Sequence, residues 1–358
     1  MKTLYILCFL CVSALVQAQN QFREEEVSYW NKADSIPLNG TLTIPNQGKN
    51  FPAVILISGS GPQDRDETLF GHKPFKIIAE YLSNRGYAVL RYDDRGGGKA
   101  NKIYTDATID NFAKDAEAGL DYLKTRPEIN SRKIGFLGHS EGGSIAPMIA
   151  SKRKDVAFVI LMAAPGRRHD VMMAEQNRDL FRAMGVDSNL VNLYVEDYYN
   201  KVFPQFPNLT DTAQVTRLVH ERIAYLRTKM TKEQLFSFGI PPQENVYMKA
   251  IISTYNNKWL RHFISFNPEI YLEQLKVPTL AINGTKDTQV NANLNLAGIE
   301  TGLKKAKNKN YKIVRLEELN HLMQHAKTGL PTEYPKIQED LAPEFIDTVY
   351  EWLKKTIH

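Results

Sequence analysis

Cysteine is almost missing from this chain of 358 residues, and its two copies, Cys8 and Cys11, lie close to the start. Beyond them the sequence excludes a disulfide framework, thiol catalysis and thiolate metal sites. The scattered histidines and aspartates show no metal-ligand spacing, so we expect neither a metal nor another cofactor. The stability of the fold should therefore come from hydrophobic burial.

Concentrated charge and long apolar runs are also lacking. The formal net charge of +5 is spread along the chain, with lysines and glutamates alternating. This pattern argues against a nucleic-acid partner or a membrane-surface role. The apolar stretch at residues 4–16 is too short to span a membrane comfortably, so no stable membrane insertion is expected.

Residues 1–18 have the features of a signal peptide. Lys2 supplies the positive start, residues 4–16 the apolar stretch, and Val16-Gln17-Ala18 a small-residue cleavage site. We therefore expect export, with cleavage near Ala18, to the periplasm or the outside of the cell. The mature chain, starting at Gln19, would then contain no cysteine.

The remaining sequence alternates between strand and helix patterns. Polar-apolar alternation at 26–30 and 38–45 predicts an antiparallel hairpin. Helical patterns at 75–85, 110–124 and 345–353 lie among or after runs that predict strands. Those runs are 53–57, 87–90, 133–137, 156–162, 278–282 and 311–316. Strands that are mostly apolar on both faces, with helices between them, predict an α/β fold with a mostly parallel central sheet covered on both sides.

Between Pro165 and Asn267 the strand pattern stops. Amphipathic stretches such as 170–184 and 231–236 take its place. We interpret residues 166–267 as a helical cap insertion at the edge of the sheet where ligands bind. The core would then consist of two parts, 19–165 and 268–358.

The hexapeptide 138–143, Gly-His-Ser-Glu-Gly-Gly, follows directly on the strand predicted at 133–137. It fits the G-x-S-x-G nucleophile elbow, in which a strand turns sharply into a helix and exposes the central serine, here Ser140. Glycine is needed on both sides because side chains there would collide in so tight a turn. The small apolar residues 144–150 predict the helix that follows, with Pro147 tolerated near its start.

A serine hydroxyl needs a base and a group that orients the base. Asp287 lies on the loop after the strand at 278–282, and His321 follows the strand at 311–316. The order serine, acid, histidine is the one used by elbow-type hydrolases. All three residues should meet at the same edge of the sheet.

With these motifs the chain resembles serine hydrolases of the α/β-hydrolase superfamily, and among them secreted bacterial esterases with a Ser-Gly-Ser-Gly-Pro loop. Here that loop occupies 58–62 and is followed by Asp64-Arg65-Asp66. The resemblance implies Ser140 as nucleophile, His321 as general base and Asp287 as its orienting acid. The expected oxyanion-hole donors are the backbone N–H of Glu141 and that of Ser60, with Gly59 next.

Each assignment has an alternative. Ser140 is an inert serine if its glycine-rich turn is only structural, and His325 is a second candidate base. Glu317 and Glu318 are alternatives to Asp287, although both are expected to lie still in the strand. His139 is expected to point the wrong way to act as the base.

Residues 93–99 combine an Asp-Asp-Arg sequence with a glycine run that ends in Lys99. A phosphate-binding loop is excluded, because the required first glycine is Asp93 and the residue after Lys99 is Ala100. We instead expect an Asp-Arg pair here to brace the active-site loops by a salt bridge.

The expected function is hydrolysis of a small-molecule or carbohydrate-linked ester by an exported serine esterase. One alternative is an exopeptidase whose insertion holds a substrate amino terminus with carboxylates such as Glu175, Glu196 and Glu221. The other alternative is a catalytically inactive binding protein that keeps the fold.

Overall fold

The computed structural model describes residues 21–357. The predicted signal peptide, its cleavage site and both cysteines lie outside the described residues. Within the described part, no helix is both long and apolar enough to cross a membrane.

An eight-stranded sheet forms the centre of the fold, in the order β1-β2-β4-β3-β5-β6-β7-β8. The strands from β4 to β8 in this order pair in parallel, whereas β2 is antiparallel to both β1 and β4. The predicted α/β fold with a mostly parallel sheet is therefore confirmed. The strands are β1 (Phe22–Asn31), β2 (Ile36–Pro45), β3 (Phe51–Ile57), β4 (Ala88–Tyr92), β5 (Ile129–His139), β6 (Val159–Met162), β7 (Thr279–Gly284) and β8 (Tyr311–Leu316).

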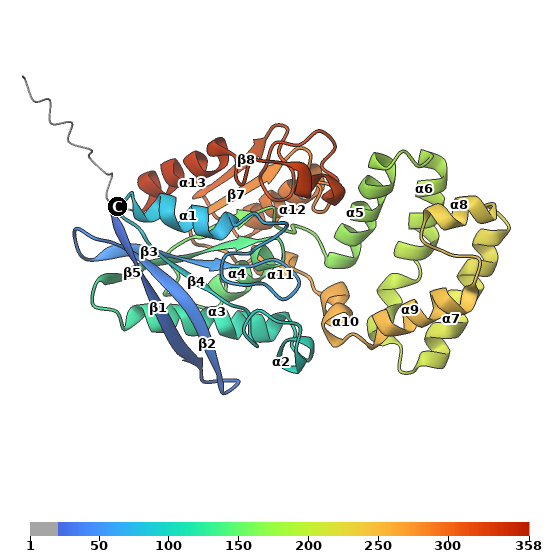
Figure 1. Cartoon of the computed structure of the whole chain (residues 1–358), viewed down its shortest axis with the longest axis horizontal. Coiled ribbons are helices and arrows are strands. Elements are labelled where there is room, and N and C mark those ends of the chain that lie inside the picture. Colours follow the sequence, from blue (N-terminus) through green and yellow to red (C-terminus); the bar gives the residue numbers. More distant parts are fainter. Residues whose placement is uncertain (1–20, 358) are drawn as a thin grey trace, which may run out of the picture.

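Helices cover both faces of this sheet (Figure 1). Alternate residues of β3 show why its sequence is apolar throughout: Val54 and Leu56 pack toward one face, and Ile55 and Ile57 toward the other. The first face is covered by α1 (Pro74–Ser83) and α13 (Pro343–Thr356), and the second by α3 (Ile109–Lys124), α4 (Gly142–Ala150), α11 (Glu269–Leu272) and α12 (Ala292–Lys305). Two shorter elements, α2 (Lys102–Thr105) and a 3-10 helix (Pro331–Lys336), lie in loops.

The chain between β6 and β7 is helical and forms a separate lobe in Figure 1. We call residues 169–265 the helical lobe. It has a hydrophobic core of its own, built around side chains such as Val191, Val219 and Ile223. Its elements are α5 (His169–Ala183), α6 (Ser188–Tyr194), a π-helical turn (Val195–Tyr199), a 3-10 helix (Phe203–Asn208), α7 (Thr212–Arg227), α8 (Lys232–Ser237), α9 (Glu244–Asn256) and α10 (Lys258–Ser265).

Several strand ends differ from the sequence prediction. β5, for example, begins at Ile129 rather than at residue 133. β6 begins at Val159 rather than Val156, because the sheet ladder with β5 begins only where Val159 pairs with Phe136. β8 ends at Leu316, so Glu317 and Glu318 lie in the turn after the strand and not in it.

Candidate active site

Ser140 lies at a sharp turn between β5 and α4. Its φ of +52° places it in the left-handed region, which costs a non-glycine residue backbone strain. A Cβ on Gly138 would lie 2.1 Å from the carbonyl oxygen of Gly142, and one on Gly142 would lie 2.1 Å from that of Ile57. Only glycine fits at these two positions, as the elbow motif requires.

His321 and Asp287 are brought together at the carboxyl ends of β8 and β7. The distance from His321 Nδ1 to Asp287 Oδ2 is 2.8 Å, and both side chains are buried. The other oxygen of Asp287 accepts the backbone N–H groups of Gln289 and Val290, each at 2.8 Å. These bonds fix the position of the carboxylate. Because the carboxylate contacts Nδ1 of His321, the other ring nitrogen, Nε2, remains available to a second group.

Ser140 is placed next to this pair through its neighbour His139. The His139 ring lies 4.8 Å from the His321 ring, and its Nε2 donates to the carbonyl oxygen of His321 at 3.0 Å. The side chain of Ser140 is partly exposed and makes no hydrogen bond within residues 21–357. The structure therefore gathers the three residues at one edge, with Asp287 and His321 in direct contact.

Glu67 is a further residue of this edge that the sequence analysis missed. Its fully buried carboxylate accepts hydrogen bonds from His139 Nδ1 at 2.8 Å and from the backbone N–H of Gly59 at 2.7 Å. Burial works against a charged His139, but the Glu67 carboxylate outweighs it, and the pKa of His139 is raised. Both ring nitrogens of His139 are thus occupied, which excludes it as the base for Ser140, as predicted.

The two expected oxyanion donors have free N–H groups. Within the described residues, neither the backbone N–H of Glu141 nor that of Ser60 meets an acceptor. Gly59, the second choice for the loop donor, gives its N–H to Glu67 instead. Ser60 is exposed and so accessible to a ligand.

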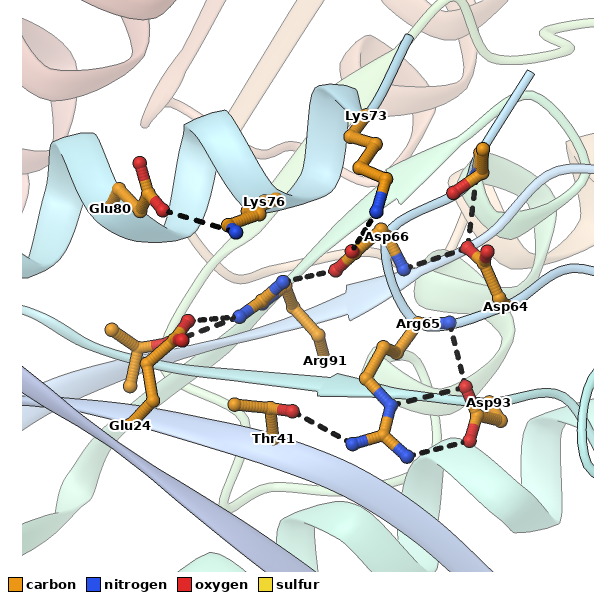
Figure 2. Close-up of polar contacts among 12 residues, drawn as sticks. Glu24, Thr41, Asp64, Arg65, Asp66, Lys73, Lys76, Glu80, Arg91 and Asp93 are labelled. Atoms are coloured by element: carbon orange, nitrogen blue, oxygen red, sulfur yellow. Dashed lines mark hydrogen bonds and ion pairs between the residues drawn. The ribbon is translucent and has the colours of Figure 1, made fainter. Parts of the chain in front are cut away.

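Ion pairs hold the loop that follows β3 (Figure 2). Arg65 donates to Asp93 at 2.8 Å and to Thr41 Oγ1 at 2.8 Å. Asp66 pairs with the buried Arg91, which also bonds Glu24 of β1 at 2.6 Å. This loop is therefore fixed to the sheet by charge-assisted bonds of two consecutive residues, Arg65 and Asp66.

The Asp-Arg sequence at 94–95 acts differently from the salt bridge predicted. Asp94 accepts the hydroxyl of Ser58 and the N–H of Gln63, both at 2.9 Å, so it does brace the oxyanion loop. Burial raises the pKa of Asp94 to about 7. Arg95 turns away and pairs with Asp115 of α3 at 2.8 Å, because that carboxylate is buried beside it.

The alternative residues are engaged elsewhere. His325 contacts Glu339 and Glu344 through its two ring nitrogens, each at 2.9 Å, on the exposed side of its loop. Glu317 accepts from Thr285, and Glu318 lies near Lys286. Within residues 21–357, no three His, Cys, Asp or Glu side chains gather in a way that would hold a metal.

Comparisons with known proteins agree with this geometry. Residues 73–239 match the family described as serine aminopeptidase S33. The chain is 30% identical over 320 residues to the esterase EstD of Thermotoga maritima, covering 89% of this chain and 66% of that protein, just under two thirds of its length.

Solved structures show the same fold at low sequence identity. The esterase Pf2001 of Pyrococcus furiosus superimposes with a TM-score of 0.53 at 18% identity, covering 94% of this chain and 92% of that one. The α/β-hydrolase GrgF of Penicillium gives 0.55 at 15% identity, covering 94% and 99%. The protein shares with them a mostly parallel sheet, and it has a serine in a sharp turn at the edge of that sheet. The chain therefore has the α/β-hydrolase fold and is similar in sequence to serine hydrolases with that fold.

Proposed function

We propose that this protein hydrolyses carboxylic esters, with Ser140 as nucleophile, His321 as general base and Asp287 as the acid that orients it. The observation that carries the proposal is the 2.8 Å contact between His321 and Asp287, placed beside the elbow by the His139 ring. The similarity to a named esterase supports the choice of substrate class.

In the first half of the reaction, His321 Nε2 takes the proton of the Ser140 hydroxyl while the oxygen attacks the ester carbonyl. The carbonyl oxygen becomes an oxyanion and accepts hydrogen bonds from the backbone N–H groups of Glu141 and Ser60. The tetrahedral intermediate then collapses, the C–O bond to the alcohol breaks, and His321 gives its proton to the leaving alcohol. The product is an acyl-enzyme on Ser140.

In the second half a water molecule replaces the alcohol. His321 removes a proton from the water as it attacks the acyl carbonyl, and Ser140 leaves with that proton. The carboxylic acid is released and the hydroxyl is regenerated. The Asp287 carboxylate orients His321 and stabilises the imidazolium that forms twice in each cycle.

We also propose that the protein acts after export, on small or carbohydrate-linked esters. The features of residues 1–18 support export. The helical lobe, lying beside the carboxyl ends of the strands, would act as a cap that shapes the substrate pocket.

An exopeptidase is the second candidate, because the matching family is described as serine aminopeptidase. The carboxylates suggested for holding an amino terminus give it little support. Glu175 pairs with Arg178, and Glu196 bonds Asn200, each within its own stretch of helix.

The test compares p-nitrophenyl esters of rising chain length with an aminoacyl p-nitroanilide. We expect turnover of the esters and very little of the anilide. Ser140→Ala should lower kcat by on the order of a millionfold, as for triads that act as a unit. His325→Gln is the matched control for His321→Gln, because it changes a histidine four residues away without touching Asp287. A Ser140→Ala protein with near wild-type turnover would contradict the assignment, and failure of the wild type to react with a fluorophosphonate would favour an inactive binding protein.

A further inference from the structure

Glu141 contributes more to the site than its backbone N–H. Its side chain is 3% exposed, and its Oε1 accepts a hydrogen bond from the indole Nε1 of Trp259 at 2.9 Å. Trp259 belongs to α10, at the end of the helical lobe, 118 residues further along the chain. One residue thus carries a proposed oxyanion donor on its backbone and a contact with the lobe on its side chain.

The carboxyl of Glu141 lies between α10 and the oxyanion loop. Glu141 also lines a small cavity of about 10 Å³ together with Ser58, Gly59 and Asp94, residues that form or hold the loop after β3. A cavity of this size holds about one water molecule. Movement of this carboxyl would therefore disturb both proposed oxyanion donors, because the second one, Ser60, is the next residue of that loop.

Helix α10 packs the helical lobe against the core of the sheet. Phe263 packs against the Trp259 ring at 5.0 Å and against the His169 ring at 4.2 Å, and it belongs to the core beneath the sheet. His169, the first residue of α5, is hydrogen-bonded through Nε2 to the hydroxyl of Ser144 at 2.9 Å. Glu141 and Ser144 lie at the start of α4, so both ends of the lobe contact the residues that directly follow Ser140.

The contact with Trp259 is needed for energetic reasons. A buried polar group without a partner is destabilising, and a buried charge without one is more so. Burial raises the pKa of Glu141 to about 8, although the indole N–H opposes the shift. The carboxyl therefore remains in place only while α10 supplies its N–H.

We propose that Glu141 and Trp259 are a positioning pair, through which the helical lobe sets the geometry of the oxyanion hole. This inference rests on the proposed ester hydrolysis at Ser140. Trp259 does not touch the reacting atoms. It fixes the side chain of the residue that does, so turnover depends on this one hydrogen bond between α10 and the start of α4.

The test is a double-mutant cycle on p-nitrophenyl acetate hydrolysis. Trp259→Phe removes the N–H and keeps an aromatic ring, whereas Glu141→Leu removes the acceptor. We expect each to lower kcat about tenfold with KM nearly unchanged, less than the roughly hundredfold or greater loss for deleting an oxyanion donor. The double variant should be no slower than the slower single variant, because both changes break one contact. Glu141→Gln, which keeps an acceptor oxygen, should stay within about threefold of the wild type.

His262→Leu is the control, since His262 makes another contact of α10 with the core, to Asp110 of α3 at 3.1 Å, away from the elbow. It should leave kcat unchanged. Wild-type kcat in Trp259→Phe, or losses that multiply in the double variant, would overturn the proposal.

Failure of the proposed function is seen separately, in a wild-type protein that turns over no ester. In that case the amide NMR resonance of residue 141 tests the pair without catalysis. We expect it to move in Trp259→Phe and not in His262→Leu, and an unmoved resonance in both would overturn the coupling.

Discussion

Glu67 and His139 are 72 residues apart in the sequence, yet the Glu67 carboxylate accepts a hydrogen bond from Nδ1 of His139 at 2.8 Å. The same oxygen accepts the N–H of Gly59, so one buried charge holds both the residue before Ser140 and the loop that carries Ser60. His139 in turn donates to the backbone of His321. Glu67 thus connects the three parts of the chain from which the proposed site is built.

Both ring nitrogens of His139 contact acceptor oxygens, and the Glu67 carboxylate is the main group that raises the pKa of this histidine. We therefore expect Glu67→Gln to lower that pKa and to favour a neutral ring with a single N–H. One of its two N–H bonds would be lost, lowering the free energy of unfolding by about 1–3 kcal/mol and kcat by about tenfold. The ¹⁵N resonances of the His139 side chain at neutral pH report the change directly. Exposed Glu351 provides the control as Glu351→Gln, and two protonated ring nitrogens persisting in Glu67→Gln would contradict this account.

Asp287→Asn should lower kcat by about 10³- to 10⁴-fold while the fold remains intact. An amide nitrogen facing His321 Nδ1 favours the tautomer with its proton on Nε2, which leaves no base for Ser140. Circular dichroism and kcat measured on the same preparation check this. Glu317→Gln, which changes the alternative acid, should retain activity, and the reverse ranking of the two variants would reassign the orienting acid.

The stability of the protein should fall as the pH rises through the neutral range. The pKa of Glu141 is raised from an ordinary value of 4.5 to about 8, so the folded protein binds this proton more tightly than the unfolded chain. The stability that the protonated Glu141 carboxyl contributes to the folded state is fully present below about pH 4.5 and is lost as the pH approaches 8. The pKa of Asp94 is also raised, to about 7, so this carboxyl adds a further loss of stability as the pH rises.

Glu141→Gln cannot ionise and should remove the Glu141 part of that loss. Relative to the wild type it should gain on the order of 4 kcal/mol between pH 4.5 and pH 9. Urea denaturation of both proteins at the two pH values measures the gain. Parallel pH profiles for the two proteins would show that the Glu141 carboxyl does not hold its proton in the folded state.

Gly142→Ala should prevent normal folding or cost more than about 3 kcal/mol, because the added Cβ meets the backbone of Ile57 at 2.1 Å and backbone cannot move aside as a side chain can. The melting temperature and soluble yield measure this effect. Gly71→Ala is the control, since nothing lies within 4 Å of its Cβ and only its positive φ adds strain. Equal losses in both variants would contradict the close approach as the reason for glycine at position 142, because Gly142, unlike Gly71, has no positive φ.

The strands and the elbow were predictable because their signals are local. The run at 53–57 is apolar throughout, since β3 is covered on both faces, and the glycines around Ser140 show directly that the turn is tight. Chain order then places Asp287 and His321 at the ends of neighbouring strands, where the structure pairs them.

The contacts of Glu67 and Trp259 were not predictable, because no local pattern marks either residue. Glu67 follows a loop of charged residues and resembles a surface glutamate in sequence, but the fold buries it completely. The Glu141 contact with Trp259 depends on how α10 packs, which the amphipathic pattern of the lobe leaves open. The direction of Arg95 was likewise decided by a tertiary neighbour, Asp115.

The hydrophobic core of the helical lobe has a practical consequence for how this protein can change. Substitutions around Val219 and Ile223 would repack helices against each other and leave the sheet edge untouched. Under the proposed cap role, selection or engineering can vary the lobe to accept new substrates without changing the proposed catalytic residues. Trp259 and His169 are the exceptions, because an exchanged lobe would have to provide the same two hydrogen bonds to the start of α4.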